Sequence, residues 1–155
     1  MSQAEMRAAA RLSAVQALYQ MEVTGKGVDE IRIEFEAFWI GHEVEGARYK
    51  PAEIALFRDI LSGVLADQVS LDRLADDTLS RDWPLRRVEA VVRAILRAGT
   101  YELKKRKDIP ARVVIKEYTD IAAAFYDREE VGLVNAVLDA LARLLRTGEF
   151  AAQAS

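Results

Sequence analysis

The chain has 155 residues, of which 51% are hydrophobic and 30% charged, with a formal net charge of −3. This length suits one domain with a buried core, and this composition excludes a disordered chain. The absence of cysteine excludes disulfides and thiolate metal sites, so nothing favours an oxidising compartment. The first twenty residues lack a signal-peptide pattern, and no window approaches about 18 uncharged apolar residues. A soluble, cytoplasmic protein without a membrane partner is expected.

The charges are unevenly distributed along the chain. Residues 22–80 hold 6 basic and 13 acidic residues, net −7, whereas residues 81–112 hold 10 basic and 4 acidic residues, net +6. A basic segment of this kind fits a phosphate backbone or an acidic partner, and it equally fits a solvated helix face. Charge alone leaves both interpretations open.

Helical periodicity dominates the N-terminal third of the sequence. Residues 5–24 are rich in Ala, Leu, Gln and Met, which favour helix, and Gly25 is a natural stop. A second, shorter helix is predicted after Asp29. The glycine and proline content of residues 41–51 predicts a loop.

Two helices are predicted in the middle of the chain. Pro51 fits the first turn of the third helix, and Ser70 is a suitable N-cap for a short fourth helix. The segment "SRDWP" at 80–84 then breaks the chain. The apolar stripes of these two helices are expected to be Phe57, Ile60, Leu61 and Val64, followed by Leu71, Leu74 and Ala75.

Three helices are predicted in the C-terminal half. Pro84 opens a long one, Pro110 opens the next, and Asp127 with Glu130 has a spacing related to a capping box that starts the last. The last helix fades near Thr147. The inward stripes are expected to be Val88, Val91, Val92, Ile95, Leu96 and Leu103; Val114, Tyr118, Ile121 and Phe125; and Val134, Val137, Leu138 and Leu141.

The pattern as a whole predicts an all-α bundle of about seven helices with no credible strand. The run "ARVVIKEY" is rich in β-branched residues, but its spacing of three and four continues to Phe125, which favours helix. Residues 1–148 are expected to form a single domain, and residues 149–155 a frayed tail.

An enzyme is not expected. The sequence contains none of the glycine-rich phosphate loops, dinucleotide fingerprints or nucleophile-elbow motifs, so no cofactor is predicted. His42 is the single histidine and has Glu43 and Glu45 nearby. It lacks the spacing and the second strong ligand that a specific metal site requires, so no metal site is predicted.

A binding function is better supported by the N-terminal helix. Arg7 and Arg11 are spaced i, i+4 and share a helix face, with Gln16 and Tyr19 further along. Guanidinium groups bind phosphates, and a tyrosine ring stacks on an unpaired base. The competing interpretation is two ordinary surface arginines and a core tyrosine. The basic run at 104–107 is more typical of a helix C-terminus than of a binding site.

Five segments, in order, resemble the NusB family of transcription antitermination proteins. They are "AVQALYQME" (14–22), "LFRDILSGV" (56–64), "ILRAGTYEL" (95–103), "DIPARVVIKEYTDIA" (108–122) and "LVNAVLDALAR" (133–143). The resemblance covers about residues 5–146. It implies seven helices in two roughly perpendicular sub-bundles.

The resemblance also implies a function. NusB-like proteins pair with the ribosomal small-subunit protein NusE, and the pair binds the single-stranded boxA element of nascent RNA. The complex acts on the RNA polymerase elongation complex, usually during ribosomal RNA transcription, and keeps it processive. No catalysis or cofactor is implied. Some members dimerise, so a homodimer is a further expectation.

Particular residues match functional positions of the family. Glu89 matches an acidic position that meets the basic ribosomal partner. Ala8 and Ala9 stand where better-studied members have arginines, and Leu133 stands where they often have phenylalanine. Fewer phosphate contacts and no aromatic ring lower RNA affinity. The implied RNA-binding residues are Arg7, Arg11, Gln16, Tyr19, Arg81, Arg86, Leu133 and Asn135.

Two alternatives to this function follow from the same residues. The sparse N-terminal arginines and net acidic charge also fit a protein-interaction module with little RNA affinity of its own. Some RNA cytosine methyltransferases carry a NusB-like domain, but no cofactor motif of that kind is present here. Asn135 has two interpretations of its own: a buried amide bonded to a neighbouring backbone, or a group that reads a base edge.

Overall fold

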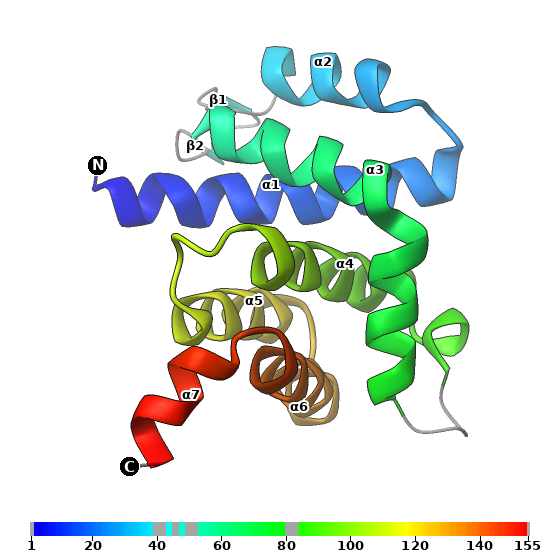
Figure 1. Cartoon of the computed structure of the whole chain (residues 1–155). Helices are drawn as coiled ribbons and strands as arrows, with labels where there is room; N and C mark the ends of the chain where they lie inside the picture. The colour runs from blue at the N-terminus through cyan, green and yellow to red at the C-terminus, as the bar shows by residue number, and fades with distance from the viewer. Residues whose placement is uncertain (1, 39–42, 45–46, 49–52, 80–83, 155) are drawn as a thin grey trace. The chain divides into compact units, whose positions relative to one another are not determined.

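The computed structural model describes residues 2–38, 43–44, 47–48, 53–79 and 84–154 (Figure 1). Within these residues the chain forms seven α-helices, one 3-10 helix and one very short β-ladder. The all-α class and the number of helices are therefore confirmed. The chain divides into two compact units, Met1–Ala66 and Asp67–Ser155, which agrees with the expected pair of sub-bundles.

The first unit contains α1 (Gln3–Thr24), α2 (Val28–Phe38) and the start of α3 (Ile54–Thr78). α1 ends as predicted at Gly25, whose φ of +76° is in the left-handed region that glycine adopts without strain. The rings of Phe35 and Phe57 stack in the core with centroids 6.0 Å apart. The predicted stripe of α3 is buried in full: Phe57, Ile60, Leu61 and Val64.

The third and fourth predicted helices both form, as the two parts of α3 on either side of a kink. Asp67 departs from helical geometry inside it, with φ −128° and ψ 19°. The break between the two parts is at Asp67, so Ser70 lies inside the second part and is not its N-cap, which corrects the predicted capping residue. Its hydroxyl instead accepts a hydrogen bond from Lys104 Nζ at 2.9 Å, and Lys104 also pairs with Asp67 at 2.6 Å. The Ser70 side chain, which the local sequence pattern predicts to cap a helix, thus makes a contact with a distant residue instead.

The second unit contains the rest of α3 and five further helical elements. α4, α5 and α6 pack on one another, and α7 packs on α6. Pro84 opens only a 3-10 turn, so the long predicted helix starts later than expected, at Ala90. The bounds are η1 (Leu85–Arg87), α4 (Ala90–Lys105), α5 (Ala111–Phe125), α6 (Arg128–Leu145) and α7 (Thr147–Ala154).

The core of the second unit is built from the predicted stripes of α4, α5 and α6. Gly99 of α4 lies so close to α6 that a Cβ on it would stand 2.9 Å from Leu138 Cδ2. The Tyr118 hydroxyl donates to the buried Glu102 carboxylate. The prediction for Phe125 is wrong, because it lies at the end of α5 and is 47% exposed. Val134, Val137, Leu138 and Leu141 of α6 are buried as predicted.

Three smaller details of the structure bear on the sequence predictions. β1 (Glu43–Val44) pairs antiparallel with β2 (Ala47–Arg48) inside the predicted loop, although a two-residue ladder leaves the fold class unchanged. Asp127 is the N-cap of α6, but its side chain makes no capping hydrogen bond. α7 covers Thr147–Ala154 and so overlaps the tail expected at 149–155. No helix in the described residues is long and apolar enough to span a bilayer.

Candidate nucleic-acid and partner interfaces

The two predicted arginines of α1 have different environments. Arg7 is half-buried, and its Nε lies 3.3 Å from Glu53 Oε2. Arg11 is only 2% exposed, and it too has interaction partners. Their i, i+4 spacing places them on one side of α1, as predicted, but that side is largely occupied by protein. Of the two, Arg7 is the one that solvent and ligands reach in this structure.

Gln16 and Tyr19 belong to a different side of the same helix. Both are exposed, Tyr19 by 38%. Nine residues separate Arg7 from Gln16, which corresponds to about 180° around a helix. Viewed down the helix axis, Ala9 and Ser13 lie within about 60° of Gln16. From Ala9 onward, the exposed side of α1 therefore carries Tyr19 and Gln16 among uncharged side chains. It has no arginine.

The 3-10 helix η1 presents two cations. Arg86 and Arg87 are exposed and make no ion pair with any described residue. Arg93 Nη1 donates to the carbonyl oxygens of Leu85 at 3.1 Å and Val88 at 2.6 Å. These bonds hold the backbone of η1, from which both arginines project into solvent. Arg81, the other predicted cation of this region, lies outside the described residues, as does His42.

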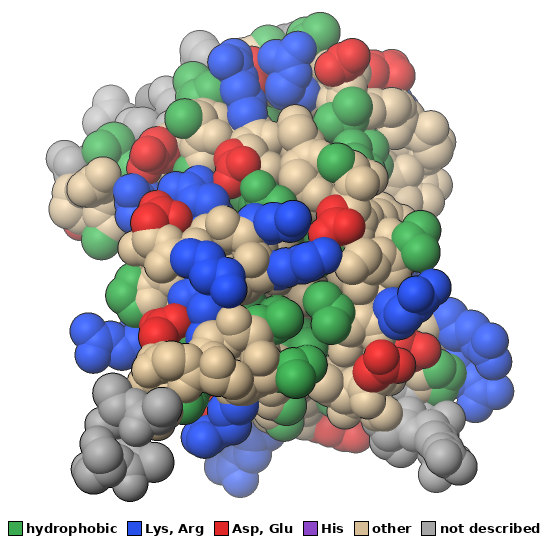
Figure 2. Space-filling view, viewed as in Figure 1, with side chains coloured by type: hydrophobic (Ala, Val, Ile, Leu, Met, Phe, Trp, Pro, Cys, Tyr) green, Lys and Arg blue, Asp and Glu red, His purple; other side chains and the backbone are tan. Residues whose placement is uncertain are grey.

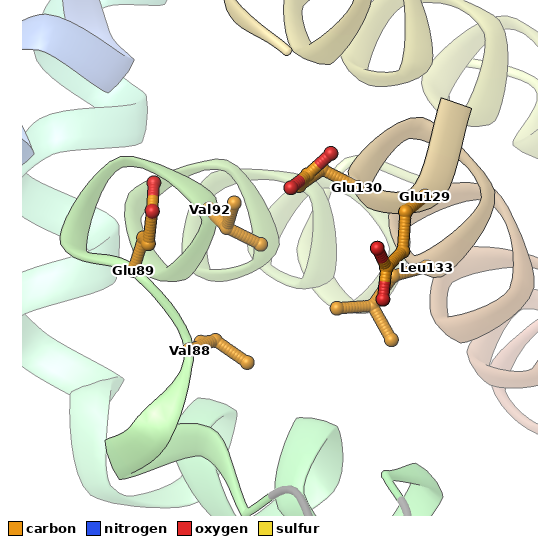
Figure 3. Close-up of a pocket in the computed structure, with 6 residues that line it drawn as sticks. All are labelled: Val88, Glu89, Val92, Glu129, Glu130 and Leu133. Atoms are coloured by element: carbon orange, nitrogen blue, oxygen red, sulfur yellow. The ribbon is translucent and has the colours of Figure 1, made fainter. Parts of the chain in front are cut away.

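A pocket of about 510 Å³ lies between the start of α4 and the start of α6 (Figure 3). Its apolar lining comes from Val88, Val92 and Leu133, and Val88 and Leu133 point toward one another across it. Two residues at the start of α6, Glu129 and Glu130, complete it together with Glu89, the N-cap of α4. The pocket thus unites Glu89 and Leu133, two of the predicted site residues.

The three carboxylates around this pocket are available to an external cation. Glu89 makes no capping hydrogen bond, and Glu89, Glu129 and Glu130 form no ion pair with a described residue. Glu129 and Glu130 are favoured where they are by the positive end of the α6 dipole. No three acidic or histidine side chains in the described part of the chain are placed to hold a metal ion. The pocket is therefore suited to an apolar group accompanied by basic groups.

Leu133 and Asn135 lie on opposite sides of α6. Two residues of separation correspond to about 200° around a helix, and the side chains line different cavities. Asn135 is exposed and faces α5. Its interpretation as a buried amide bonded to a neighbouring backbone is therefore wrong. Leu133 and Asn135 are not parts of one contact surface.

Most side chains of the basic run at 104–107 contact other residues of the protein. Lys104 bonds to Asp67 and Ser70, Arg106 pairs with Asp108 at 3.1 Å, and Lys107 Nζ donates to the carbonyl of Leu145. These contacts tie the chain between α4 and α5 to its surroundings. The prediction that the run belongs to a helix C-terminus is confirmed.

Residues 8–143 match the sequence profile of the NusB family. The chain belongs to the NusB family. Its relatives include the transcription antitermination protein NusB of Nitrobacter hamburgensis, 62% identical over 96% of this chain and 92% of that protein. The NusB of Bradyrhizobium diazoefficiens is 60% identical over 95% of this chain and 89% of that protein. NusB proteins are transcription antitermination factors and not enzymes.

Solved NusB structures share the fold of this chain. NusB of T. maritima superposes with a TM-score of 0.72 at 28% identity, over 88% of this chain and 90% of that one. A second similar chain comes from the crystal structure of the antitermination factors NusB and NusE in complex with dsRNA. It has a TM-score of 0.73 at 21% identity, over 93% of this chain and 99% of that one. At that identity the likeness concerns the fold.

The sequence predicted two of the residues that line this pocket and not the others. It selected Glu89 and Leu133 separately and assigned them to different partners. It took Glu130 only as a capping residue and did not consider Glu129. The available signal was the adjacent acidic pair at a helix start, four residues before an apolar side chain. That pattern is common at helix N-termini, so it does not by itself indicate a pocket.

Proposed function

We propose that this protein binds single-stranded boxA RNA together with the ribosomal protein NusE and supports processive transcription of ribosomal RNA. It acts in the cytoplasm and reaches the RNA polymerase elongation complex through this assembly. The observation that carries the proposal is the apolar pocket surrounded by Glu89, Glu129 and Glu130, in a chain of the NusB family. A pocket of this charge fits a basic protein and repels a phosphate backbone.

The partner occupies the pocket through an apolar side chain flanked by basic residues. Leu133 and Val88 contact the apolar side chain, and Glu89 attracts the basic residues. Leu133 therefore belongs with the protein partner in this proposal, whereas its place in the sequence resemblance is at the RNA. Since Leu133 lacks a π-face, contact with a protein side chain suits it better than contact with a base.

RNA contacts are proposed separately for α1 in the first unit and for η1 in the second. Tyr19 stacks on a base, Gln16 bonds to a base edge, and Arg7 and Arg86 contact phosphates. Arg11 has no direct contact in this proposal because it is 2% exposed. Its role is to hold the helix that presents the others.

The RNA contact is tested by fluorescence anisotropy on boxA RNA in the presence of NusE. Tyr19→Ala should weaken binding about tenfold, because a stacked base is worth roughly 1–3 kcal/mol. Arg7→Ala should reduce the salt dependence by about one phosphate contact. Val23→Ala, an exposed change one turn further along α1, is the matched control. Unchanged affinity in both Tyr19→Ala and Arg7→Ala contradicts this contact.

The partner contact is tested by titrating NusE without RNA. Glu89→Lys should lower the affinity by about tenfold or more, since it places a cation where a basic partner approaches. Asp77→Lys makes the same charge change at an exposed site of α3 outside the pocket. If both variants lose affinity equally, the effect is one of net charge and the pocket is not the contact.

A protein-interaction module with little RNA affinity is the second candidate. It is favoured by the burial of Arg11, the pairing of Arg7 with Glu53 and the uncharged accessible side of α1 from Ala9 onward. The two candidates differ in one measurement, the affinity of NusE for boxA RNA with and without this protein. An affinity that this protein never raises, although the protein pair forms, identifies the module.

A further inference from the structure

The 3-10 helix η1 is too short to hold its conformation by its own hydrogen bonds. It has three residues, and the bond at its end runs from the N–H of Val88 to the carbonyl of Leu85 at 3.2 Å. Bonds in such turns have poor geometry, and forming a first helical turn costs more than its few bonds return. The conformation of η1 therefore depends on contacts from elsewhere in the second unit.

Two charged side chains make such contacts, one from α3 and one from α4. The N-cap of η1 makes no side-chain capping bond, and the N–H of Leu85 donates to Asp76 Oδ1 at 2.8 Å instead. Arg93 Nη1 donates to the carbonyls of Leu85 at 3.1 Å and Val88 at 2.6 Å. Hydrogen bonds to ionised groups are stronger than those between neutral groups. Asp76 and Arg93 thus hold the η1 backbone from its first residue to its C-cap.

The residues that η1 carries serve both proposed ligands. Arg86 and Arg87 are exposed and form no ion pair with a described residue, so they are available to phosphates. Val88 is buried and lines the partner pocket, and Glu89 follows it in the lining (Figure 3). The chain therefore passes directly from the proposed RNA contacts to the proposed protein contacts, without an intervening residue.

This adjacency links the two binding events. Ordering a segment costs free energy on binding, and the ligand that must order it binds less tightly. A partner side chain packed on Val88 holds the backbone from which Arg86 projects, so RNA has less ordering left to do. The link is reciprocal, because RNA must raise the affinity for the partner by the same factor.

We propose that Asp76 and Arg93 couple partner binding to RNA binding. Neither side chain contacts a ligand in this proposal, and both are positioning residues that act through the backbone of η1. With both in place, a partner that packs on Val88 also holds the backbone of Arg86 and Arg87. Without them, the pocket and the two cations respond separately. The inference rests on the proposed function and adds how one ligand raises the affinity for the other.

The test uses the full chain, NusE and fluorescently labelled boxA RNA. Anisotropy gives the dissociation constant for RNA without NusE and with saturating NusE, and the ratio of the two constants is the coupling factor. Arg93→Met and Asp76→Ala should each lower the coupling factor about threefold or more, within the range for residues that transmit coupling. The dissociation constant without NusE should change less than the coupling factor does, because neither residue contacts RNA.

Arg97→Met is the matched control for Arg93→Met. It removes another partly buried arginine, one turn further along α4, which pairs with Asp72 at 2.8 Å. This control should keep the wild-type coupling factor even where it lowers the melting temperature. An equal loss of coupling in both arginine variants would be the effect of general destabilisation and would overturn the proposal.

Asp76 gives a test that is independent of a partly buried arginine, because this residue is exposed. Asp76→Asn keeps a side-chain oxygen that can accept from the Leu85 N–H, so it should retain the coupling that Asp76→Ala loses. Both variants remove the same negative charge, so a difference between them is not an effect of charge. Equal coupling factors in the two variants would overturn the role of this hydrogen bond.

The remaining outcomes separate this proposal from the proposed function. If the wild-type chain never raises the RNA affinity of NusE, the proposed function fails, and the coupling proposal fails with it. If wild type couples the two ligands and both Arg93→Met and Asp76→Ala keep the wild-type coupling factor, the function stands and the coupling proposal alone is overturned. A lower coupling factor in both, with wild-type coupling in Arg97→Met and Asp76→Asn, supports it.

Discussion

Arg146, at the end of α6, connects this helix to the end of α4 and to the segment that follows it. Its side chain is almost fully buried, and Nε donates to the carbonyl of Leu103 at 2.7 Å. Nη2 donates to the carbonyls of Glu102 and Arg106, and Nη1 to that of Ile109. The last carbonyls of a helix have no partner within it. One guanidinium from the end of α6 therefore supplies a donor to the Leu103 carbonyl. It adds a second donor to the carbonyls of Glu102 and Arg106, which also accept backbone hydrogen bonds.

Arg146→Lys should destabilise the protein by roughly 3 kcal/mol, because one ammonium cannot reach carbonyls spread around a planar fork and leaves buried acceptors unpaired. Urea denaturation measures the change. Arg143→Lys is the matched control: its side chain is 62% exposed and pairs with Asp139 one turn away, so less than about 1 kcal/mol is expected. Equal losses in the two variants would show that the carbonyl contacts of Arg146 are not what stabilises this region.

At the scale of elements, α7 is held in place by one carboxylate and one ring. Glu149 Oε1 accepts a hydrogen bond from the backbone N–H of Ala111 at 2.9 Å, and Oε2 pairs with Arg146 at 2.6 Å. The Phe150 ring lies beneath the Arg143 guanidinium, 4.8 Å from its carbon to the ring centroid. The same carboxylate that anchors α7 thus also caps α5. These contacts attach the first part of α7 to α5 and α6.

The attachment of α7 should depend on pH. The hydrogen bond from Ala111, followed by that from Arg146, lowers the pKa of Glu149 below its ordinary value of 4.5. Because the pKa of Glu149 is lower in the folded state, its ionised carboxylate stabilises the fold fully at pH values above the ordinary pKa. This contribution is lost as the pH falls through the pKa of the folded state. Glu149→Gln should therefore reduce stability modestly at neutral pH, and the difference from wild type should shrink in acid.

Thermal unfolding of wild type and Glu149→Gln, measured from neutral pH into acid, tests this difference in stability. Its size is small because the Glu149 side chain is 39% exposed and solvent screens the pair. Glu117→Gln, a change on the surface of α5 outside these contacts, serves as the control. A stability difference between Glu149→Gln and wild type that stays constant into acid would contradict the assignment.

At the scale of the whole molecule, the basic segment of residues 81–112 is not one continuous binding surface. Arg97 pairs with Asp72, and Lys104 with Asp67, while Arg93 and Lys107 bond to backbone carbonyls. On the face drawn in Figure 2, acidic side chains lie among the basic ones. The cations of this segment that form no ion pair with a described residue include Arg86, Arg87, Lys105 and Arg112.

Part of the basic segment therefore fits a structural role and part of it fits a binding surface. Its internally paired residues stabilise the second unit, and its exposed ones are available to phosphates. The acidic pocket interrupts them at Glu89, so charge changes sign within a few residues along the chain. A protein that meets a basic partner and an RNA at once requires this kind of separation, because each ligand repels the surface suited to the other. The grouping of residues 1–148 into one domain stays a prediction.

The sequence by itself determined the fold class, most of each apolar stripe and the family. Helix periodicity follows from backbone hydrogen bonds between residues four apart, so it is readable locally. The stripe of α6, Val134 to Leu141, is buried as predicted for this reason. The matched family motifs are likewise local strings of residues. Where local rules failed, as at Ser70 and Phe125, a distant contact or a helix end decided the outcome.

The tertiary structure alone decided which side chains share a site. Arg11 and Tyr19 belong to one predicted binding helix, yet one is 2% exposed and the other 38%. Leu133 and Asn135 are two residues apart, yet they line different cavities, and Leu133 joins Glu89 from forty-four residues earlier. Exposure and pairing depend on how segments far apart in the chain pack. Periodicity within one helix carries no information about that packing.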